Sequence, residues 1–207
     1  MSDAASLRVV WLIRHAESEW NALGRWQGQR DPVLSERGRE QAQRLVATLA
    51  DARLEAIVAS DLARARETAA IVGGALGVPL HLDARLRERD LGHWSGLTSV
   101  EIVARWPHDL ARLRARDLEL QPGGGESLRA LHARAAAFVT LLSVWPGDGP
   151  LAVVTHAGIL RVLGITPAPG NAAVRSATIG ALRRALASSA ATQPAPRVEE
   201  NDGEERL

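Results

Sequence analysis

The chain has 207 residues, enough for one domain with a hydrophobic core of ordinary size. Its 25 Lys and Arg residues balance 24 Asp and Glu residues, and this net charge of +1 argues against a nucleic-acid-binding surface. The chain has no Cys, no apolar run near the roughly 20 residues of a membrane span, and no signal-peptide pattern in residues 1–8. We therefore expect a cytoplasmic protein that binds neither nucleic acid nor a membrane. A homodimer is left open.

The pattern of apolar residues predicts strands that alternate with amphipathic helices. Residues 9–13, Val-Val-Trp-Leu-Ile, form an unbroken and partly β-branched run that is typical of a buried strand. Further strands are predicted at 54–59, 78–82 and 151–155, and helices at 35–51, 60–75, 98–116, from 127 to about 142, and from 159. Ser60 and Asp61 stand where they could cap the second of these helices. This alternation indicates an α/β fold with a mostly parallel sheet between two layers of helices.

The composition changes near the C-terminus. From about residue 187 the sequence turns to Ser, Ala, Pro and Glu, with few apolar residues that could anchor it to a core. We therefore predict one domain over residues 7–187 and a disordered tail over residues 188–207.

Cationic and nucleophilic side chains follow three of the predicted strands. Arg14 and His15 follow the first strand, Arg64 lies in the first turn of the helix after the second, and His156 follows the strand at 151–155. In open parallel sheets, ligands bind beyond the carboxyl ends of the strands. If these strands are neighbours, two arginines and two histidines converge on one pocket.

These residue types suit phosphoryl transfer. The charge of its transition state is spread over three oxygens, on which Arg14 and Arg64 can each place two N–H donors. A neutral His15 can attack phosphorus, and a protonated His156 would add charge and a donor. The leaving alkoxide needs a proton, for which Glu88 is the best candidate.

Five segments resemble the histidine phosphatase (phosphoglycerate mutase-like) superfamily in their order and spacing. These are residues 14–21, 60–69, 86–88 with 92–96, 122–127 and 154–158, within a match from about 9 to 165. The resemblance implies that His15 becomes a phosphohistidine and that Glu88 is the proton donor. It implies a phosphate pocket made by Arg14, Arg64 and His156.

The resemblance also implies the fold and some weaker assignments. The family fold is a three-layer α/β/α sandwich with a mostly parallel sheet, and it needs no metal or other cofactor. Asn21 and Gln27 stand where the family often lines the substrate phosphate. After His156 the family has a further helix and a strand that carries an Asn. Only residues 171–179 are available for that strand, and their poor match predicts a weakened sheet edge.

We predict a metal-independent phosphomonoester hydrolase that acts on a small-molecule phosphomonoester through a phosphohistidine at His15. A phosphoglycerate mutase is the first alternative. The mutase branch carries a longer insertion than the one between Gly96 and Pro122, and residues 26–35 look more like phosphatase members, so hydrolysis is favoured. A non-catalytic phospholigand-binding protein is the second alternative, suggested by the irregular C-terminal region.

Overall fold

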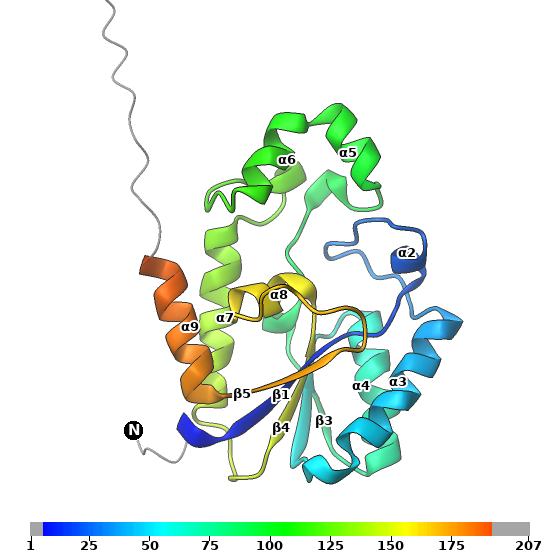
Figure 1. Cartoon of the computed structure of the whole chain (residues 1–207), viewed down its shortest axis with the longest axis vertical. Helices are drawn as coiled ribbons and strands as arrows, with labels where there is room; N and C mark the ends of the chain where they lie inside the picture. Colours follow the sequence, from blue (N-terminus) through cyan, green and yellow to red (C-terminus); the bar gives the residue numbers. More distant parts are fainter. Residues whose placement is uncertain (1–5, 192–207) are drawn as a thin grey trace, which may run out of the picture.

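A five-stranded sheet forms the centre of the fold in this computed structural model, which describes residues 6–191 (Figure 1). The strands lie in the order β3-β2-β4-β1-β5. β1 (Val9–Arg14), β4 (Leu151–Thr155), β2 (Ala56–Ala59) and β3 (Leu80–Leu82) are mutually parallel, and β5 (Val174–Thr178) pairs antiparallel with β1. The sheet is therefore mostly parallel, as predicted.

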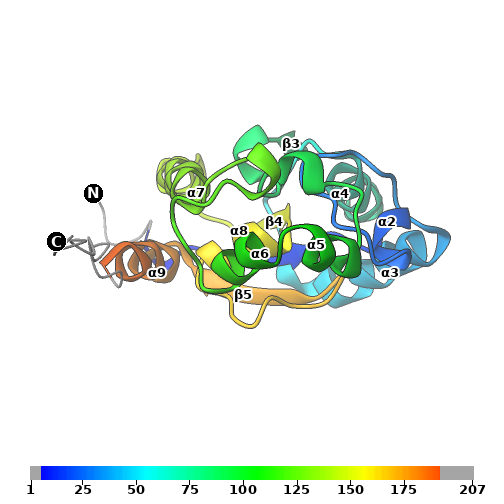
Figure 2. The ribbon, with the colours of Figure 1, turned by 90° about the horizontal axis from the view of Figure 1, so that it is seen from above.

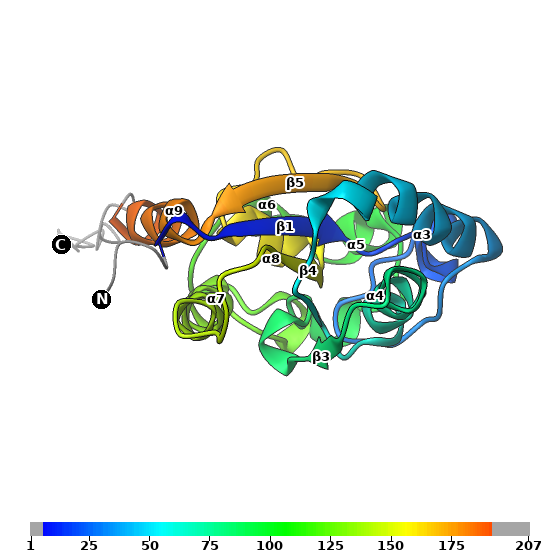
Figure 3. The same ribbon diagram turned by 90° about the horizontal axis from the view of Figure 1, so that it is seen from below.

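Helices cover both faces of the sheet. α3 (Glu36–Leu49) and α4 (Ala63–Leu76) lie on one side, and α7 (Leu128–Leu142) and α9 (Ile179–Ala191) on the other (Figure 3). α8 (Ala157–Val162) contributes to the core on the same side as α7 and α9. No helix within residues 6–191 is both long and apolar enough to cross a membrane.

The side chains of β4 show how the two cores are divided. Successive residues of a strand point to opposite faces of the sheet. Accordingly, Leu151 and Val153 pack in the core beneath α7, α8 and α9, whereas Ala152 and Val154 pack in the core beneath α3 and α4. All residues of β4 are buried, which explains why residues 151–154 are uniformly apolar rather than alternating. This three-layer arrangement confirms the predicted fold class.

Two short helices form a cap above the carboxyl ends of the strands (Figures 1 and 2). They are α5 (Ser99–Arg105) and α6 (Pro107–Arg114), where the sequence analysis predicted one helix over residues 98–116. That prediction was wrong because Pro107 lacks an N–H donor and pushes Trp106 out of the helical conformation, to φ −137° and ψ 58°. The other predicted helices and strands are present, with ends shifted by a few residues.

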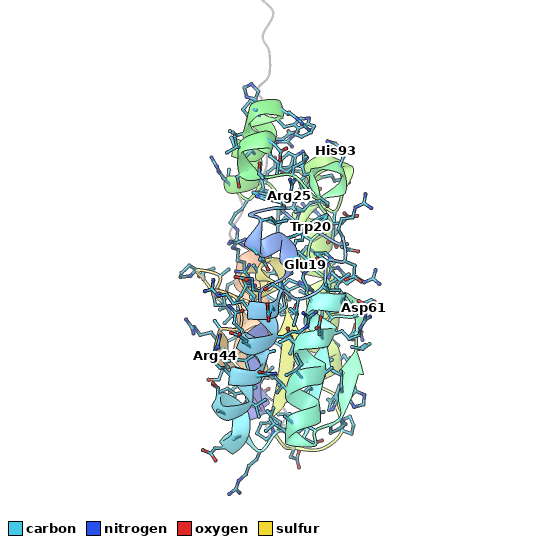
Figure 4. All side chains as sticks on the ribbon, turned by 90° about the vertical axis from the view of Figure 1, so that its right-hand side faces the viewer. Glu19, Trp20, Arg25, Arg44, Asp61 and His93 are labelled. Atoms are coloured by element: carbon cyan, nitrogen blue, oxygen red, sulfur yellow. The ribbon has the colours of Figure 1, made fainter. Side chains whose placement is uncertain are left out.

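The cap has an apolar core of its own. Trp94, Ile102 and Leu110 are buried together, and the Trp94 and Trp106 rings stack with centroids 5.9 Å apart. Trp20 belongs to α2 (Glu19–Ala22), which lies below the cap (Figures 1 and 4). The cap is thus a packed unit, and it forms one wall of the space above the sheet.

The C-terminal region completes the sheet. Every residue of β5 pairs with β1, in a register that runs from Val9 opposite Thr178 to Ile13 opposite Val174. The sequence predicted a weakened edge here because residues 171–179 match the family poorly. In the structure β5 is only partly buried, but it is fully paired. α9 follows directly and includes residues 188–191, which we had assigned to the tail. The rest of the predicted tail, residues 192–207, lies outside the described residues.

Candidate active site

Three neighbouring strands end beside one another and carry polar residues at their ends. The backbone N–H of Ser60 donates to the Val154 carbonyl at 3.0 Å, and that of His15 donates to the Thr155 carbonyl at 2.9 Å. Sheet pairing thus continues one residue beyond β2 and β1. Ser60, His156 and His15 therefore lie side by side, as the predicted convergence requires.

The two histidines form the centre of the site. Their ring centroids are 5.0 Å apart; His156 is fully buried and the exposed fraction of His15 is 3%. Nδ1 of His15 lies 2.7 Å from the carbonyl oxygen of Ala16. Because a carbonyl oxygen only accepts hydrogen bonds, this contact assigns the hydrogen to Nδ1 and leaves the lone pair on Nε2. His15 can therefore act as a nucleophile through Nε2.

His156 is oriented by a hydroxyl group. Its Nε2 lies 2.9 Å from Oγ of Ser60, while its buried Nδ1 has no hydrogen-bond partner among the described residues. If the Ser60 hydroxyl donates to Nε2, Nδ1 carries the hydrogen of the neutral ring and can donate it to a ligand. The sequence indicated Ser60 only as a helix cap. In the structure α4 begins after Leu62, so the role of Ser60 as a partner of His156 was missed.

Two arginines approach the histidines with part of their guanidinium groups unpaired. Arg64 is buried, and its Nη1 and Nη2 donate to the carbonyls of Arg30 and Gly28 at 2.8 Å each. Nη1 of Arg14 donates to the Pro169 carbonyl at 2.9 Å. These bonds fix the direction of both side chains. The Nε–H groups of Arg14 and Arg64 are buried and donate to no partner among the described residues.

Buried donors without partners are concentrated at this site. Four buried side-chain polar atoms in the described part of the chain have no hydrogen-bond partner, and three of them are Arg14 Nε, Arg64 Nε and His156 Nδ1. A buried unsatisfied donor costs about 1–3 kcal/mol, so such groups are rare unless a ligand satisfies them. Three donors around His15 indicate a site for an anion with several oxygens.

The electrostatic environment keeps both imidazoles neutral. Burial, together with the nearby Arg64 charge, holds the pKa of His15 well below its usual value of 6.5. The pKa of His156 is lowered by the same two causes and by His15. Burial lowers the pKa of Arg64 to about 10, so this side chain remains charged at neutral pH. The sequence suggested a protonated His156; the structure instead has two neutral imidazoles beside charged guanidinium groups.

We expect the free energy of unfolding to decrease as the pH falls below 6.5. In the unfolded chain His15 and His156 bind protons near that value, whereas in the folded chain they stay neutral to much lower pH. Their contribution is therefore fully present above pH 6.5 and is lost below it. Urea unfolding between about pH 8 and pH 5 measures this slope. His15→Leu should flatten it, and replacing the exposed His81 by Ala should not; equal slopes in all three proteins would contradict the assignment.

Glu88 lies beside the histidines and is held by backbone groups. Its carboxylate accepts hydrogen bonds from the N–H groups of Arg89 at 2.7 Å and Gly158 at 3.0 Å. A Cβ on residue 158 would overlap with Oε1 of Glu88. Only glycine at the start of α8 permits this close approach. Sequence reasoning noted Gly158 as part of a motif but did not identify its contact with Glu88.

The two amide side chains that were predicted beside the phosphate both line the cavity. Oε1 of Gln27 accepts a hydrogen bond from the Ser18 hydroxyl at 2.9 Å. Nδ2 of Asn171 donates to Oδ1 of Asn21 at 3.1 Å and to the His15 carbonyl at 3.0 Å. Asn171 lies in the segment whose sequence match was poor, and it connects the C-terminal region directly to the end of β1.

A cavity of about 810 Å³ opens between the strand ends and the cap. Arg14, His15, Arg64 and Glu88 line its inner part, and residues of the cap and of α8 line its outer part. No three His, Asp or Glu side chains in residues 6–191 gather closely enough to hold a metal ion. The groups that are present can bind a tetrahedral oxyanion, offer a nucleophilic nitrogen and exchange a proton with a carboxyl group.

Known proteins are similar to this chain in sequence and in fold. Residues 10–166 match the family described as the histidine phosphatase superfamily (branch 1). A glucosyl-3-phosphoglycerate phosphatase of Mycolicibacterium vanbaalenii is 39% identical over 165 residues, which cover 76% of this chain and 72% of that protein. Phosphoserine phosphatase 1 of Hydrogenobacter thermophilus is 36% identical over 152 residues, which cover 73% of this chain and 72% of that protein.

A mutase and a solved phosphatase structure are also similar. A 2,3-bisphosphoglycerate-dependent phosphoglycerate mutase of Xanthobacter autotrophicus is 37% identical over 174 residues, covering 80% of this chain and 82% of that protein. The structure of a mycobacterial glucosyl-3-phosphoglycerate phosphatase complexed with VO3 superimposes with a TM-score of 0.73 at 34% identity, covering 82% of this chain and 90% of that one. These matches confirm the predicted family. The chain belongs to the histidine phosphatase superfamily, branch 1.

Proposed function

We propose that this enzyme hydrolyses small-molecule phosphomonoesters through a phosphohistidine formed at Nε2 of His15. The observation that carries the proposal is the set of three buried, unpaired donors around that nitrogen: Arg14 Nε, Arg64 Nε and His156 Nδ1. A phosphoryl group bonded to Nε2 would place its oxygens among these donors. The vanadate complex of a similar phosphatase and the two phosphatases among the relatives support the same chemistry.

In the first step, Nε2 of His15 attacks phosphorus and the bond from phosphorus to the ester oxygen breaks. Glu88, in its protonated form, gives its proton to the leaving oxygen, so the alcohol departs neutral. Arg14, Arg64 and His156 donate to the non-bridging oxygens, whose charge they stabilise. The phosphorylated imidazole becomes cationic, and the Ala16 carbonyl, which already accepts from Nδ1, stabilises that charge.

In the second step, water attacks the phosphorylated histidine. The Glu88 carboxylate takes a proton from the water, the bond between phosphorus and Nε2 breaks, and inorganic phosphate leaves. His15 returns to its neutral form and Glu88 to its protonated form, so each group ends as it began. The proposal thus needs one nucleophile and one proton carrier, and this chain provides both.

Phosphoglycerate mutase activity is the alternative that a specific observation favours, since a mutase is among the relatives. Between Gly96 and Pro122 the cap consists of α5 and α6 alone, which supports hydrolysis because the mutase branch carries a longer insertion there. The non-catalytic alternative was suggested only by the irregular sequence of the C-terminal region. Because β5 and α9 give that region regular structure, this alternative has no further support.

The identity of the products tests the proposal. Purified enzyme is incubated with an aryl phosphate and, separately, with 3-phosphoglycerate, and inorganic phosphate and 2-phosphoglycerate are both measured. A rapid quench in alkaline denaturant, followed by mass spectrometry of the peptide that contains residue 15, detects the phosphoenzyme. We expect phosphate release and phosphorylation of His15. Formation of the 2-isomer without phosphate would assign a mutase, and turnover without a phosphorylated His15 would overturn the mechanism.

Replacing Gly158 by Ala is expected to lower kcat by about tenfold to a thousandfold. The added methyl group displaces the Glu88 carboxylate, and proton donation by a positioned group contributes about 10²–10⁴-fold. The loss should be greater for an alkyl phosphate than for p-nitrophenyl phosphate, whose leaving group needs little protonation. Gly74→Ala is the control, since nothing lies within 4 Å of a Cβ there. An equal loss for both esters would show that Glu88 does not protonate the leaving group.

A further inference from the structure

We infer that Arg161 binds a second oxyanion, a carboxylate or another phosphate, on the alcohol portion of the substrate. The preferred substrates would then be phosphomonoesters with two anionic ends. This inference rests on the proposed function, in which Glu88 protonates the leaving oxygen. The alcohol portion of the substrate must then lie on the side of the cavity next to Glu88. Three observations support the inference: the positive charge of the cavity wall, the hydrogen-bond partners of the arginines that line it, and the face of α8 on which Arg161 lies.

The cavity carries more positive charge than one phosphate group requires. Among the described residues, seven arginines line it, and Glu88 is the only carboxylate that does. A phosphomonoester brings at most two negative charges, and Arg14 and Arg64 already reach the proposed phosphoryl position. A simple phosphomonoester therefore leaves arginine charge in the rest of the cavity without a counter-charge from the substrate.

The arginines differ in whether the protein itself occupies their donors. Arg89 is buried and donates to two backbone carbonyls, at 2.8 and 2.6 Å. Arg25 donates to the Gly96 carbonyl at 2.5 Å and lies 3.9 Å from the Glu101 carboxylate. Arg161, in contrast, is exposed, and its side chain makes no hydrogen bond or ion pair with the described residues. Its donors are available to a ligand.

The position of Arg161 on α8 determines which part of a substrate it meets. Gly158, Arg161 and Val162 all line the cavity, as residues i, i+3 and i+4 of one helix face should. The N–H of Gly158 holds the Glu88 carboxylate, so Arg161 lies about 5 Å further along the axis of the same helix. Because Glu88 faces the leaving oxygen, Arg161 faces the alcohol beyond it. Burial lowers the pKa of Arg14, and the charge of Arg161 adds to that effect.

The cap faces the same part of the cavity. Arg114, in the last turn of α6, lines the cavity and makes no hydrogen bond or ion pair with its side chain among the described residues. Seen from above, α6 projects over α8, and Figure 1 shows that α6 lies higher, in the cap (Figures 1 and 2). Leu113 and Pro167 provide apolar surface in this outer part. A substrate that enters between the two helices thus meets positive charge on both sides and an apolar wall.

A matched set of esters tests the inference. Glycerol 3-phosphate has a neutral end, 3-phosphoglycerate replaces that end by a carboxylate, and glycerol 1,3-bisphosphate replaces it by a phosphate. We expect kcat/KM to be about tenfold to a hundredfold higher for 3-phosphoglycerate or for glycerol 1,3-bisphosphate than for glycerol 3-phosphate. A hydrogen bond between charged groups contributes free energy of that size. The preferred ester identifies the second group. Equal kcat/KM for all three would overturn the inference, whereas no phosphate from any ester would overturn the proposed function instead.

Variants then assign the preference to Arg161. Arg161→Gln should lower kcat/KM for the preferred ester at least tenfold more than for glycerol 3-phosphate, and Arg161→Glu should widen that difference by repelling the anion. Arg44→Gln is the control for net charge, because Arg44 is exposed on α3 away from the cap (Figure 4). Thermal unfolding verifies that each variant is folded. An equal loss for all esters in Arg161→Gln would show that Arg161 holds the transferred phosphoryl group, and an unchanged preference would exclude Arg161.

Discussion

Replacing His15 by Ala is expected to abolish phosphate release, with a loss of about four to six orders of magnitude in kcat, as is typical when a catalytic nucleophile is removed. The site would keep its positive charge, because Arg14 and Arg64 remain, and the neutral His156 would still be present as a donor. Binding of inorganic phosphate, measured by calorimetry, should therefore persist, whereas no phosphorylated protein should accumulate. The variant separates covalent chemistry from anion binding.

Two controls make this result decisive. His81 is exposed on β3, and its replacement by Ala should leave turnover unchanged, which controls for the loss of a histidine as such. Inorganic phosphate should also bind to the His15 variant at a pH where both histidines are neutral in the parent protein. If the His15 variant retained a tenth or more of the parent rate, His15 would not carry the phosphoryl group.

Arg64→Gln is expected to lower kcat by about a hundredfold to a thousandfold, as is typical when one preorganised donor to a transition-state oxyanion is lost. The guanidinium group is buried, two of its nitrogens are held by backbone carbonyls, and its unpaired Nε faces the site. Its charge also lowers the pKa of His15. The acid limb of the pH–rate profile should therefore move upward towards 6.5 in this variant.

The neighbouring Arg66 provides a matched control. It lies on the same helix, is exposed, and donates to the Asp61 carbonyl at 3.1 Å. Arg66→Gln should change kcat by less than about twofold, because its exposed hydrogen bond to a backbone carbonyl lies outside the site. Stability of both variants is followed by urea unfolding, since Arg64 also fixes the loop at residues 28–30. An unchanged acid limb together with normal kcat in Arg64→Gln would remove Arg64 from the proposed mechanism.

The helices and strands that the sequence predicted are those whose pattern of residues lies within the element itself. β1 and β4 are short apolar runs, and α7 has an N-terminal cap at Ser127 and a regular apolar stripe. β5 has no such pattern, because it lies at an edge and is defined by its pairing with β1. The break between α5 and α6 had a local signal in Pro107, which our interpretation from the capping box at Thr98 did not use.

The candidate site shows the same division. Arg14 ends β1, and His15 and His156 directly follow β1 and β4, so sheet topology alone brings them together. The contacts of Ser60 with His156, of Gly158 with Glu88 and of Asn171 with the His15 carbonyl join segments that lie far apart in sequence. Each depends on a loop conformation that no local pattern encodes. Motifs therefore indicated which residues gather, but not how they are held.

The contact between Asn171 and the end of β1 has a consequence for the order in which the protein is made. His15 leaves the ribosome early, whereas the residues that secure its backbone and cover the outer edge of β1 are synthesised more than 150 residues later. Until then the nascent chain carries an uncovered strand edge, which is prone to pair with other chains. The active site can therefore be complete only after the C-terminal region of the chain has been synthesised.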